Sequence, residues 1–106
     1  MKILFLGDIV GPSGCMVVKK YLKKIVEENK INFVIANGEN AAHNGVGITK
    51  DVLDNLIEFG INVLTTGNHV WDHKETLKLV EDDNRLLRPF NLIGTSPGKG
   101  FEIYQT

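Results

Sequence analysis

The sequence of 106 residues has a single cysteine and no marked excess of charge of either sign. Cys15 alone cannot form an internal disulfide or a multi-cysteine zinc site, and such sparse cysteine usage is typical of a reducing compartment, so we expect a cytoplasmic protein. With 12 Lys and Arg against 13 Asp and Glu, the formal net charge is -1. Nucleic acids and anionic membranes attract an excess of positive charge, so this balance predicts neither non-specific nucleic-acid binding nor membrane-surface binding.

Long apolar stretches are also missing. The longest ones, such as residues 3–6 and 33–36, fall far short of the roughly 20 residues that cross a bilayer. Hydrophobic residues make up 42% of the chain and charged residues 24%. These values are close to those of ordinary globular proteins, so we expect residues 1–106 to form a single domain.

Short apolar runs alternate along the chain with segments of helical period. Strands are predicted at residues 2–7, 32–36 and 61–66, and helices at residues 16–29, 50–59 and 73–81. Thr49 is suited to cap the second helix, and Asp72 with Glu75 has the spacing of a capping box for the third. This β-α-β-α-β-α order predicts an α/β fold with a parallel sheet and right-handed crossovers.

The periodicity weakens after Arg85. Turns are predicted at Pro89, Gly94, Pro97, Gly98 and Gly100, and residues 101–104 look like a further strand. A parallel sheet needs cover on both faces, and three helices can barely supply it. We therefore expect the chain to be the front part of a larger fold.

Polar residues follow each of the three predicted strands. They are Gly7-Asp8, Asn37-Gly38-Glu39-Asn40 and Gly67-Asn68-His69. Because the carboxyl ends of strands in an open parallel sheet form the ligand crevice, we expect these side chains to converge there. Carboxylate and amide oxygens with an imidazole nitrogen suit manganese, iron or magnesium. Two such cations about 3.5–4 Å apart can activate water for phosphoryl displacement.

Each of these polar residues also has a purely structural interpretation. Asp8 could cap the turn that follows it, Asn68 is common in turns, and an isolated His69 is more often a hydrogen-bonded loop residue than a ligand. Residues 7–14 lie between a strand and a helix, as a nucleotide loop does, but they match neither G-x-G-x-x-G nor G-x-x-x-x-G-K-[ST]. A metal-free dinucleotide site is therefore not expected, while the metal and structural interpretations both stay open.

Four blocks of sequence, in order, resemble one family of phosphoesterases. They read GDIVG at residues 7–11, NGENAA at 37–42, GNHVWD at 67–72, and RP at 88–89 followed by PGKG at 97–100. Gly67-Asn68-His69 matches the GNH block of the calcineurin-like metallophosphoesterases, and the four blocks together are similar to the YmdB-type 2′,3′-cyclic-nucleotide 2′-phosphodiesterases. The resemblance spans nearly the whole chain and implies the N-terminal part of a metallophosphoesterase-type α/β sandwich.

The resemblance implies a dinuclear phosphodiesterase that opens 2′,3′-cyclic nucleotides to 3′-nucleotides. Its substrate is thus expected to be a cyclic nucleotide or another small phosphodiester. Iron or manganese would be its metals, with magnesium as a further fit. Asp8 and Asn40 would bind the first metal, Glu39 would bridge both, and Asn68 would bind the second. His69 would donate a proton to the leaving oxygen, which suits imidazole because it exchanges protons near neutral pH.

Members of the resembled family are more than twice this length, and their later half supplies three further metal-binding histidines. This sequence has only His43, His69 and His73. His43 would either line a substrate pocket or be a solvated loop residue, and His73 has no assigned role. We therefore expect a chain truncated at its C-terminus, inactive alone and able to form homo-oligomers through exposed apolar sheet surface. The alternative function is a catalytically dead module that binds nucleotides or metals.

Overall fold

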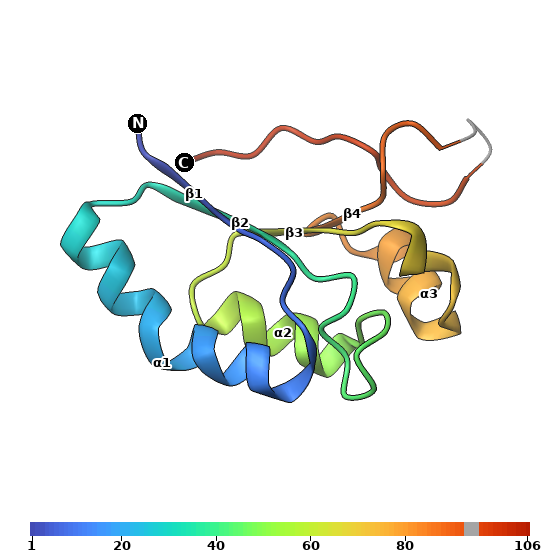
Figure 1. The fold of residues 1–106 in the computed structure, drawn as a ribbon. Coiled ribbons are helices and arrows are strands. Elements are labelled where there is room, and N and C mark those ends of the chain that lie inside the picture. The colour runs from blue at the N-terminus through green and yellow to red at the C-terminus, as the bar shows by residue number, and fades with distance from the viewer. Residues whose placement is uncertain (93–95) are drawn as a thin grey trace.

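Four parallel strands form one sheet in the computed structural model, which describes residues 1–92 and 96–106 (Figure 1). The strands are β1 (Ile3–Leu6), β2 (Phe33–Asn37), β3 (Val63–Thr65) and β4 (Leu86–Leu87). Their order in the sheet is β1-β2-β3-β4, so each strand pairs with the next one along the chain. The predicted parallel sheet is confirmed, and β4 adds a fourth strand that the sequence did not predict. The turn expected at Gly94 lies outside the described residues.

Three α-helices and one 3₁₀ turn connect these strands. They are α1 (Gly11–Asn29), α2 (Lys50–Glu58), the 3₁₀ turn Asn68–Trp71 and α3 (Lys74–Asp82). Right-handed crossovers between successive parallel neighbours place every helix on the same face of the sheet, and Figure 1 shows the C-terminal segment crossing the other face. The helices are therefore not divided between the two faces. In the described part of the chain, no helix has both the length and the apolar character needed to span a membrane.

The hydrophobic core lies between the sheet and its layer of helices. Side chains alternate across a strand, and one set from the strands packs with the helices: Leu4, Leu6, Val34, Ala36, Leu64 and Leu86. The alternate residues of the edge strand β1 point away from the helices, and Ile3 and Phe5 are 56% and 58% exposed. One face of the sheet is therefore well buried, while the other keeps apolar side chains in contact with solvent.

Helix α1 begins at Gly11, five residues before the predicted start at Met16. Pro12 stands in the first turn, where its fixed φ suits a helix and its missing N–H leaves no helical hydrogen bond unmade. Tyr21 and Ile25, which have the spacing of the buried face, are 48% and 39% exposed. They are exposed because α1 packs on the core through Val18 and Leu22, which leaves the flank that carries Tyr21 and Ile25 in contact with solvent.

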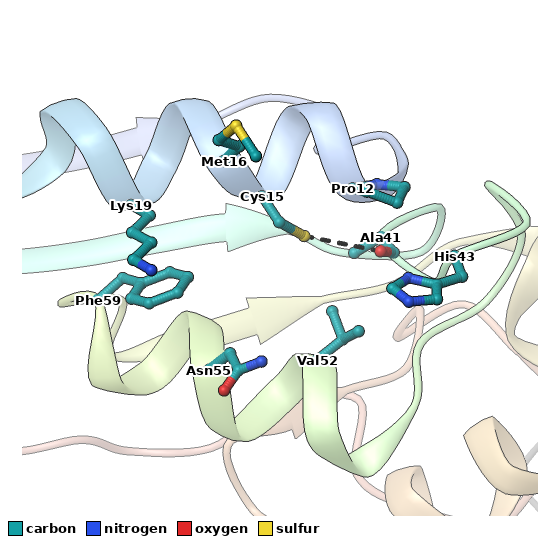
Figure 2. A pocket seen from close by; sticks show the side chains of 9 residues that line it. All are labelled: Pro12, Cys15, Met16, Lys19, Ala41, His43, Val52, Asn55 and Phe59. Atoms are coloured by element: carbon teal, nitrogen blue, oxygen red, sulfur yellow. Dashed lines mark hydrogen bonds between the residues drawn. The ribbon is translucent and has the colours of Figure 1, made fainter.

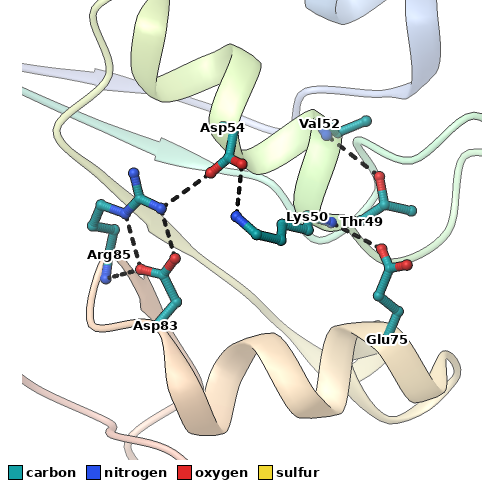
Figure 3. Close-up of polar contacts among 7 residues, drawn as sticks. All are labelled: Thr49, Lys50, Val52, Asp54, Glu75, Asp83 and Arg85. Atoms are coloured by element: carbon teal, nitrogen blue, oxygen red, sulfur yellow. Dashed lines mark hydrogen bonds and ion pairs between the residues drawn. The ribbon is translucent and has the colours of Figure 1, made fainter.

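The caps of α2 and α3 differ in how well the sequence predicted them. Thr49 caps α2 as expected, because its hydroxyl accepts the Val52 N–H at 3.4 Å. The capping box predicted for α3 is wrong: Asp72 ends the 3₁₀ turn with helical backbone angles, and His73 takes the N-cap position. The Glu75 carboxylate instead accepts the Lys50 N–H at 2.8 Å, so it caps the start of α2 from the neighbouring helix (Figure 3).

An ion-pair network holds β4 against the two helices. The Arg85 guanidinium donates to Asp83 at 2.9 and 2.7 Å and to Asp54 of α2 at 3.2 Å (Figure 3). Asp54 also pairs with Lys50 at 2.8 Å. Arg85 directly precedes β4, so its ion pairs fasten the start of this strand to the end of α3 and to α2. These contacts help a strand of only two residues to keep its place in the sheet.

The strand predicted at residues 101–104 is not present. The Tyr104 ring packs against Phe33 of β2 with 5.9 Å between ring centroids, and the Arg88 N–H donates to the Lys99 carbonyl at 3.0 Å. This segment crosses the face of the sheet, where the strand backbones already pair with one another, so it has no free strand edge to join (Figure 1).

Candidate functional site

The loops after β1 and β2 are joined by backbone hydrogen bonds at the carboxyl end of the sheet. The Ile9 N–H donates to the Asn37 carbonyl at 3.1 Å, and the Gly11 N–H donates to the Asn40 carbonyl at 2.9 Å. Asp8 immediately precedes Ile9, the first of these two attachments, so its side chain is held beside the loop that carries Asn40. Backbone hydrogen bonds between the two loops therefore bring the strand-end residues of β1 and β2 together, as expected.

Asn40 connects Asp8 to His69 through its side-chain amide. Its Nδ2 donates to Asp8 Oδ1 at 3.0 Å, and its Oδ1 lies 2.5 Å from His69 Nδ1. An amide oxygen can only accept, so His69 Nδ1 carries the hydrogen of this contact. The other ring nitrogen, Nε2, is then the atom that His69 can present to a ligand, and the His69 side chain is 36% exposed.

Glu39 reaches from the β2 loop to the 3₁₀ turn after β3. Its Oε2 accepts the His69 N–H at 3.4 Å and lies 3.9 Å from His69 Nδ1, while its side chain is only 18% exposed. A Cβ at Gly67 would overlap both carboxylate oxygens. The backbone of Glu39 is fixed by Asn37, whose Oδ1 accepts the Glu39 N–H at 3.2 Å and so forms an Asx turn.

The structure places the other two candidate residues apart from these contacts. Asn68 begins the 3₁₀ turn and is exposed, and within the described residues its side chain makes no hydrogen bond. His43 lies in the loop before α2 and lines a groove of about 210 Å³ between α1 and α2 (Figure 2). In that groove, burial raises the pKa of the Cys15 thiol, which donates to the Ala41 carbonyl at 3.6 Å.

The donor types of the cluster suit a hard divalent cation. Asp8 and Glu39 offer carboxylate oxygens, and Asn40 Oδ1 has a second lone pair besides the one that faces His69. Among residues 1–92 and 96–106, no three His, Cys, Asp or Glu side chains are grouped closely enough to hold a metal ion. These residues therefore fit as part of a metal centre, which amide oxygens or ligands from elsewhere would have to complete.

Three residues that shape the site were given no role of their own from the sequence: Asn37, Gly67 and Thr76. Asn37 carries a usable signal, because Asn-Gly after an apolar run predicts a turn of this kind. Gly67 and Thr76 carry none, because their roles depend on contacts with Glu39 and with Ile48, which are distant in sequence. Only the folded chain shows which glycine faces a carboxylate and which threonine faces a loop.

The YmdB-like protein family matches residues 4–106 of this sequence. The chain belongs to this family. Over 94% of its length, this YmdB-like chain is 46% identical to a Bacillus subtilis (strain 168) protein named 2′,3′-cyclic-nucleotide 2′-phosphodiesterase. It covers only 38% of that relative. The resemblance found in the four sequence blocks is thus confirmed.

Two solved structures share the fold of the YmdB-like chain. A hypothetical protein from Thermus thermophilus superimposes with a TM-score of 0.90 at 39% identity, over 100% of this chain and 40% of that one. A phosphatase from Mycoplasma pneumoniae gives a TM-score of 0.87 at 34% identity, over 98% of this chain and 39% of that one. The predicted fold class is confirmed, and the chain spans about two-fifths of the length of these relatives.

Proposed function

We propose that this chain supplies part of a dinuclear metal centre in a phosphodiesterase that opens 2′,3′-cyclic nucleotides to 3′-nucleotides. The observation that carries the proposal is the continuous set of contacts from Asp8 through Asn40 to His69, with the Glu39 carboxylate against the same histidine. The name of the Bacillus subtilis relative supports the substrate class. Activity belongs, in this proposal, to a protein of the length of that relative.

Four residues would hold the metals, which are iron or manganese, with magnesium as a further fit. Asp8 and Asn40 would bind one ion, Glu39 would bridge the pair, and Asn68 would bind the other. When bound, two such cations supply Lewis-acid charge that lowers the pKa of water and stabilises phosphate oxygens. The protein contributes the placement of the ligands, because Asn37 fixes the Glu39 backbone and Gly67 leaves room for its carboxylate.

His69 would act as the general acid. Water would add to phosphorus and release one proton to solvent, the bond from phosphorus to the 2′ oxygen would break, and the departing 2′ oxygen would take a proton from His69, which solvent would then reprotonate. The 3′ oxygen keeps the phosphate, so the product is a 3′-nucleotide. The contact with Asn40 Oδ1 orients the ring and leaves Nε2 as the nitrogen that faces the leaving group. His43 lines the groove between α1 and α2 and is given no role in this step.

A second function, a metal- or nucleotide-binding module without turnover, is favoured by one observation. No three His, Cys, Asp or Glu side chains are grouped for a metal within the described residues, so this length of chain offers an incomplete ligand set. Such a module would bind a metal or nucleotide saturably and hydrolyse nothing. The cytoplasmic location expected from the single cysteine stays a prediction beside both functions.

Metal binding and hydrolysis test the two functions separately. We expect Mn²⁺ to broaden the NMR signals of Asp8, Glu39 and Asn40 in this chain, and Glu39→Gln to weaken that effect. Glu58→Gln, at an exposed position of α2, is the matched control. Unchanged broadening in Glu39→Gln contradicts the ligand assignment.

Hydrolysis is measured on the full-length protein with 2′,3′-cyclic AMP and Mn²⁺. We expect Glu39→Gln and His69→Ala each to lower kcat by roughly 100-fold or more, because a general acid contributes roughly 10²- to 10⁴-fold and Glu39 would hold both metals. Full activity in both variants contradicts the proposed active site. Saturable Mn²⁺ binding with no hydrolysis by the wild-type protein supports the module instead.

A further inference from the structure

We propose that Thr76 is a positioning residue that fixes the loop carrying Glu39 and Asn40 against the segment carrying His69. Thr76 lies in α3, outside the cluster itself, and touches none of the proposed metal ligands. The effect of Thr76 on a metal site rests on the proposed function. Its effect on the position of the loop does not depend on any metal.

Thr76 makes two hydrogen bonds to one residue of the β2 loop. Its hydroxyl donates to the Ile48 carbonyl at 2.8 Å and accepts the Ile48 N–H at 3.0 Å. The side chain is fully buried, and Ile48 is fully buried as well. A threonine inside a helix commonly bonds to a carbonyl of its own preceding turn. Thr76 instead satisfies both backbone groups of a distant residue, so it holds the end of the loop in one place and one orientation.

The loop passes this constraint from Ile48 back to Glu39. The Gly47 N–H donates to the Glu39 carbonyl at 2.6 Å, and the Ala42 N–H donates to the Gly47 carbonyl at 2.9 Å. Gly47 has φ +74, and a Cβ there would lie 2.8 Å from Thr76 Oγ1. Only glycine allows the loop to approach α3 this closely. Thr76 is thus hydrogen-bonded to Ile48, and the adjacent Gly47 is hydrogen-bonded to the backbone of Glu39.

The other side of the constraint reaches His69. Helix α3 begins at Lys74, with only Asp72 and His73 between it and the 3₁₀ turn that contains His69, and the Asp72 N–H donates to the His69 carbonyl at 3.1 Å. Thr76 therefore fastens the Glu39 loop to the same continuous segment that carries His69. The contacts between Glu39, Asn40 and His69 depend on how these two parts are spaced, which Thr76 sets from within the core.

Amide hydrogen exchange without metal tests whether Thr76 holds the loop in place. We expect Thr76→Val, which has the same shape without the hydroxyl, to speed exchange at Gly47 and Ala42 about tenfold relative to amides of α1 and β2, because local opening becomes easier. Thr76→Ser restores a hydroxyl and should restore slow exchange. Val80→Ala, which removes core volume from the same helix, should shift these amides no more than the others. Thr76→Cys, with a weakly bonding thiol, replaces Thr76→Val if that variant does not fold.

Unchanged exchange at Gly47 and Ala42 in Thr76→Val or Thr76→Cys overturns the inference, and so does an equal local change in Val80→Ala. A second readout is Mn²⁺ affinity, which we expect to fall severalfold in Thr76→Val, to recover in Thr76→Ser and to stay at the wild-type value in Val80→Ala. If Mn²⁺ has no effect on the wild-type chain, the proposed function fails, and the exchange result still decides the role of Thr76.

Discussion

The Glu39 carboxylate lies in the space that a side chain at Gly67 would fill. Glu39 follows β2 and Gly67 follows β3, so the two positions meet only because their strands are neighbours in the sheet. A glycine at the end of β3 therefore admits a carboxylate from the adjacent loop and lets it contact the backbone of His69.

Gly67→Ala should displace Glu39 and weaken metal binding. A residue that orients a metal ligand typically changes metal affinity by roughly 10- to 100-fold, and we expect Mn²⁺ affinity measured by titration calorimetry to fall by that factor. Gly7→Ala is the matched control, because Gly7 also follows a strand and a Cβ there would have nothing within 4 Å. Equal Mn²⁺ affinity in the two variants would show that Gly67 is not needed to place Glu39.

The Arg85 network predicts a loss of stability in acid. The hydrogen-bonded Arg85 guanidinium holds the pKa of the Asp83 carboxyl below its usual value. A carboxyl with a lower pKa in the folded state stabilises the fold above the unfolded pKa of about 3.9, and this contribution is lost as the pH falls through the folded pKa. Asp83→Asn should therefore lower the free energy of unfolding by about 1 kcal/mol at neutral pH and by less below about pH 4.

Thermal unfolding followed by circular dichroism between pH 7 and pH 2 measures this difference. Asp82→Asn removes the same charge from an exposed position of the same helix and is the control. A constant gap between wild type and Asp83→Asn across the whole pH range would contradict the role given to the Arg85 contact.

The exposed apolar side chains of β1, on the sheet face away from the helices, predict self-association. Phe5 is 58% exposed on the face away from the helices, and burying such a side chain against a second copy would remove apolar surface from water. Phe5→Thr keeps a residue suited to a strand and should shift the association midpoint to higher concentration in sedimentation velocity. Val17→Thr changes an equally exposed apolar residue of α1, also 58%, and should have the smaller effect. A wild-type chain that stays monomeric at all concentrations would disprove this prediction.

The half-buried Cys15 thiol should be alkylated more slowly in the folded chain than in the unfolded chain. Burial raises the pKa of this thiol, so a smaller fraction is thiolate, the nucleophilic form, at a given pH. We expect iodoacetamide at pH 8 to modify Cys15 more slowly than the same cysteine in the urea-unfolded chain, and the ratio of the two rates to narrow as the pH rises. Equal rates at pH 8 would mean that Cys15 is not protected by burial between α1 and α2.

The position of the site could be predicted from the sequence because its residues follow directly after apolar runs. Asp8, Glu39, Asn40 and His69 each stand at the end of a strand, and parallel pairing brings such ends together. The contacts that fix these side chains could not be predicted in the same way. They depend on which atoms face one another across different loops, as Gly67 and Glu39 do.

The errors in the predicted fold have the same origin. Glu75 has the spacing to cap its own helix, yet it caps α2, because Lys50 lies beside it in the folded chain. Tyr21 and Ile25 have the spacing of a buried face, yet they stay exposed, and the buried apolar side chains of α1 are those of Val18 and Leu22. In each case the local pattern was consistent with more than one arrangement, and packing between elements chose among them.

The strand order has a consequence for how the chain assembles during synthesis. Every strand pairs with the strand that precedes or follows it in the sequence, as Ile3 does with Phe33 and Ala36 with Leu64. Because each strand pairs with its neighbour along the chain, the sheet can be extended strand by strand as the nascent chain emerges from the ribosome. Asp8 and Asn40 can meet once β2 has joined β1, and His69 is added when β3 follows.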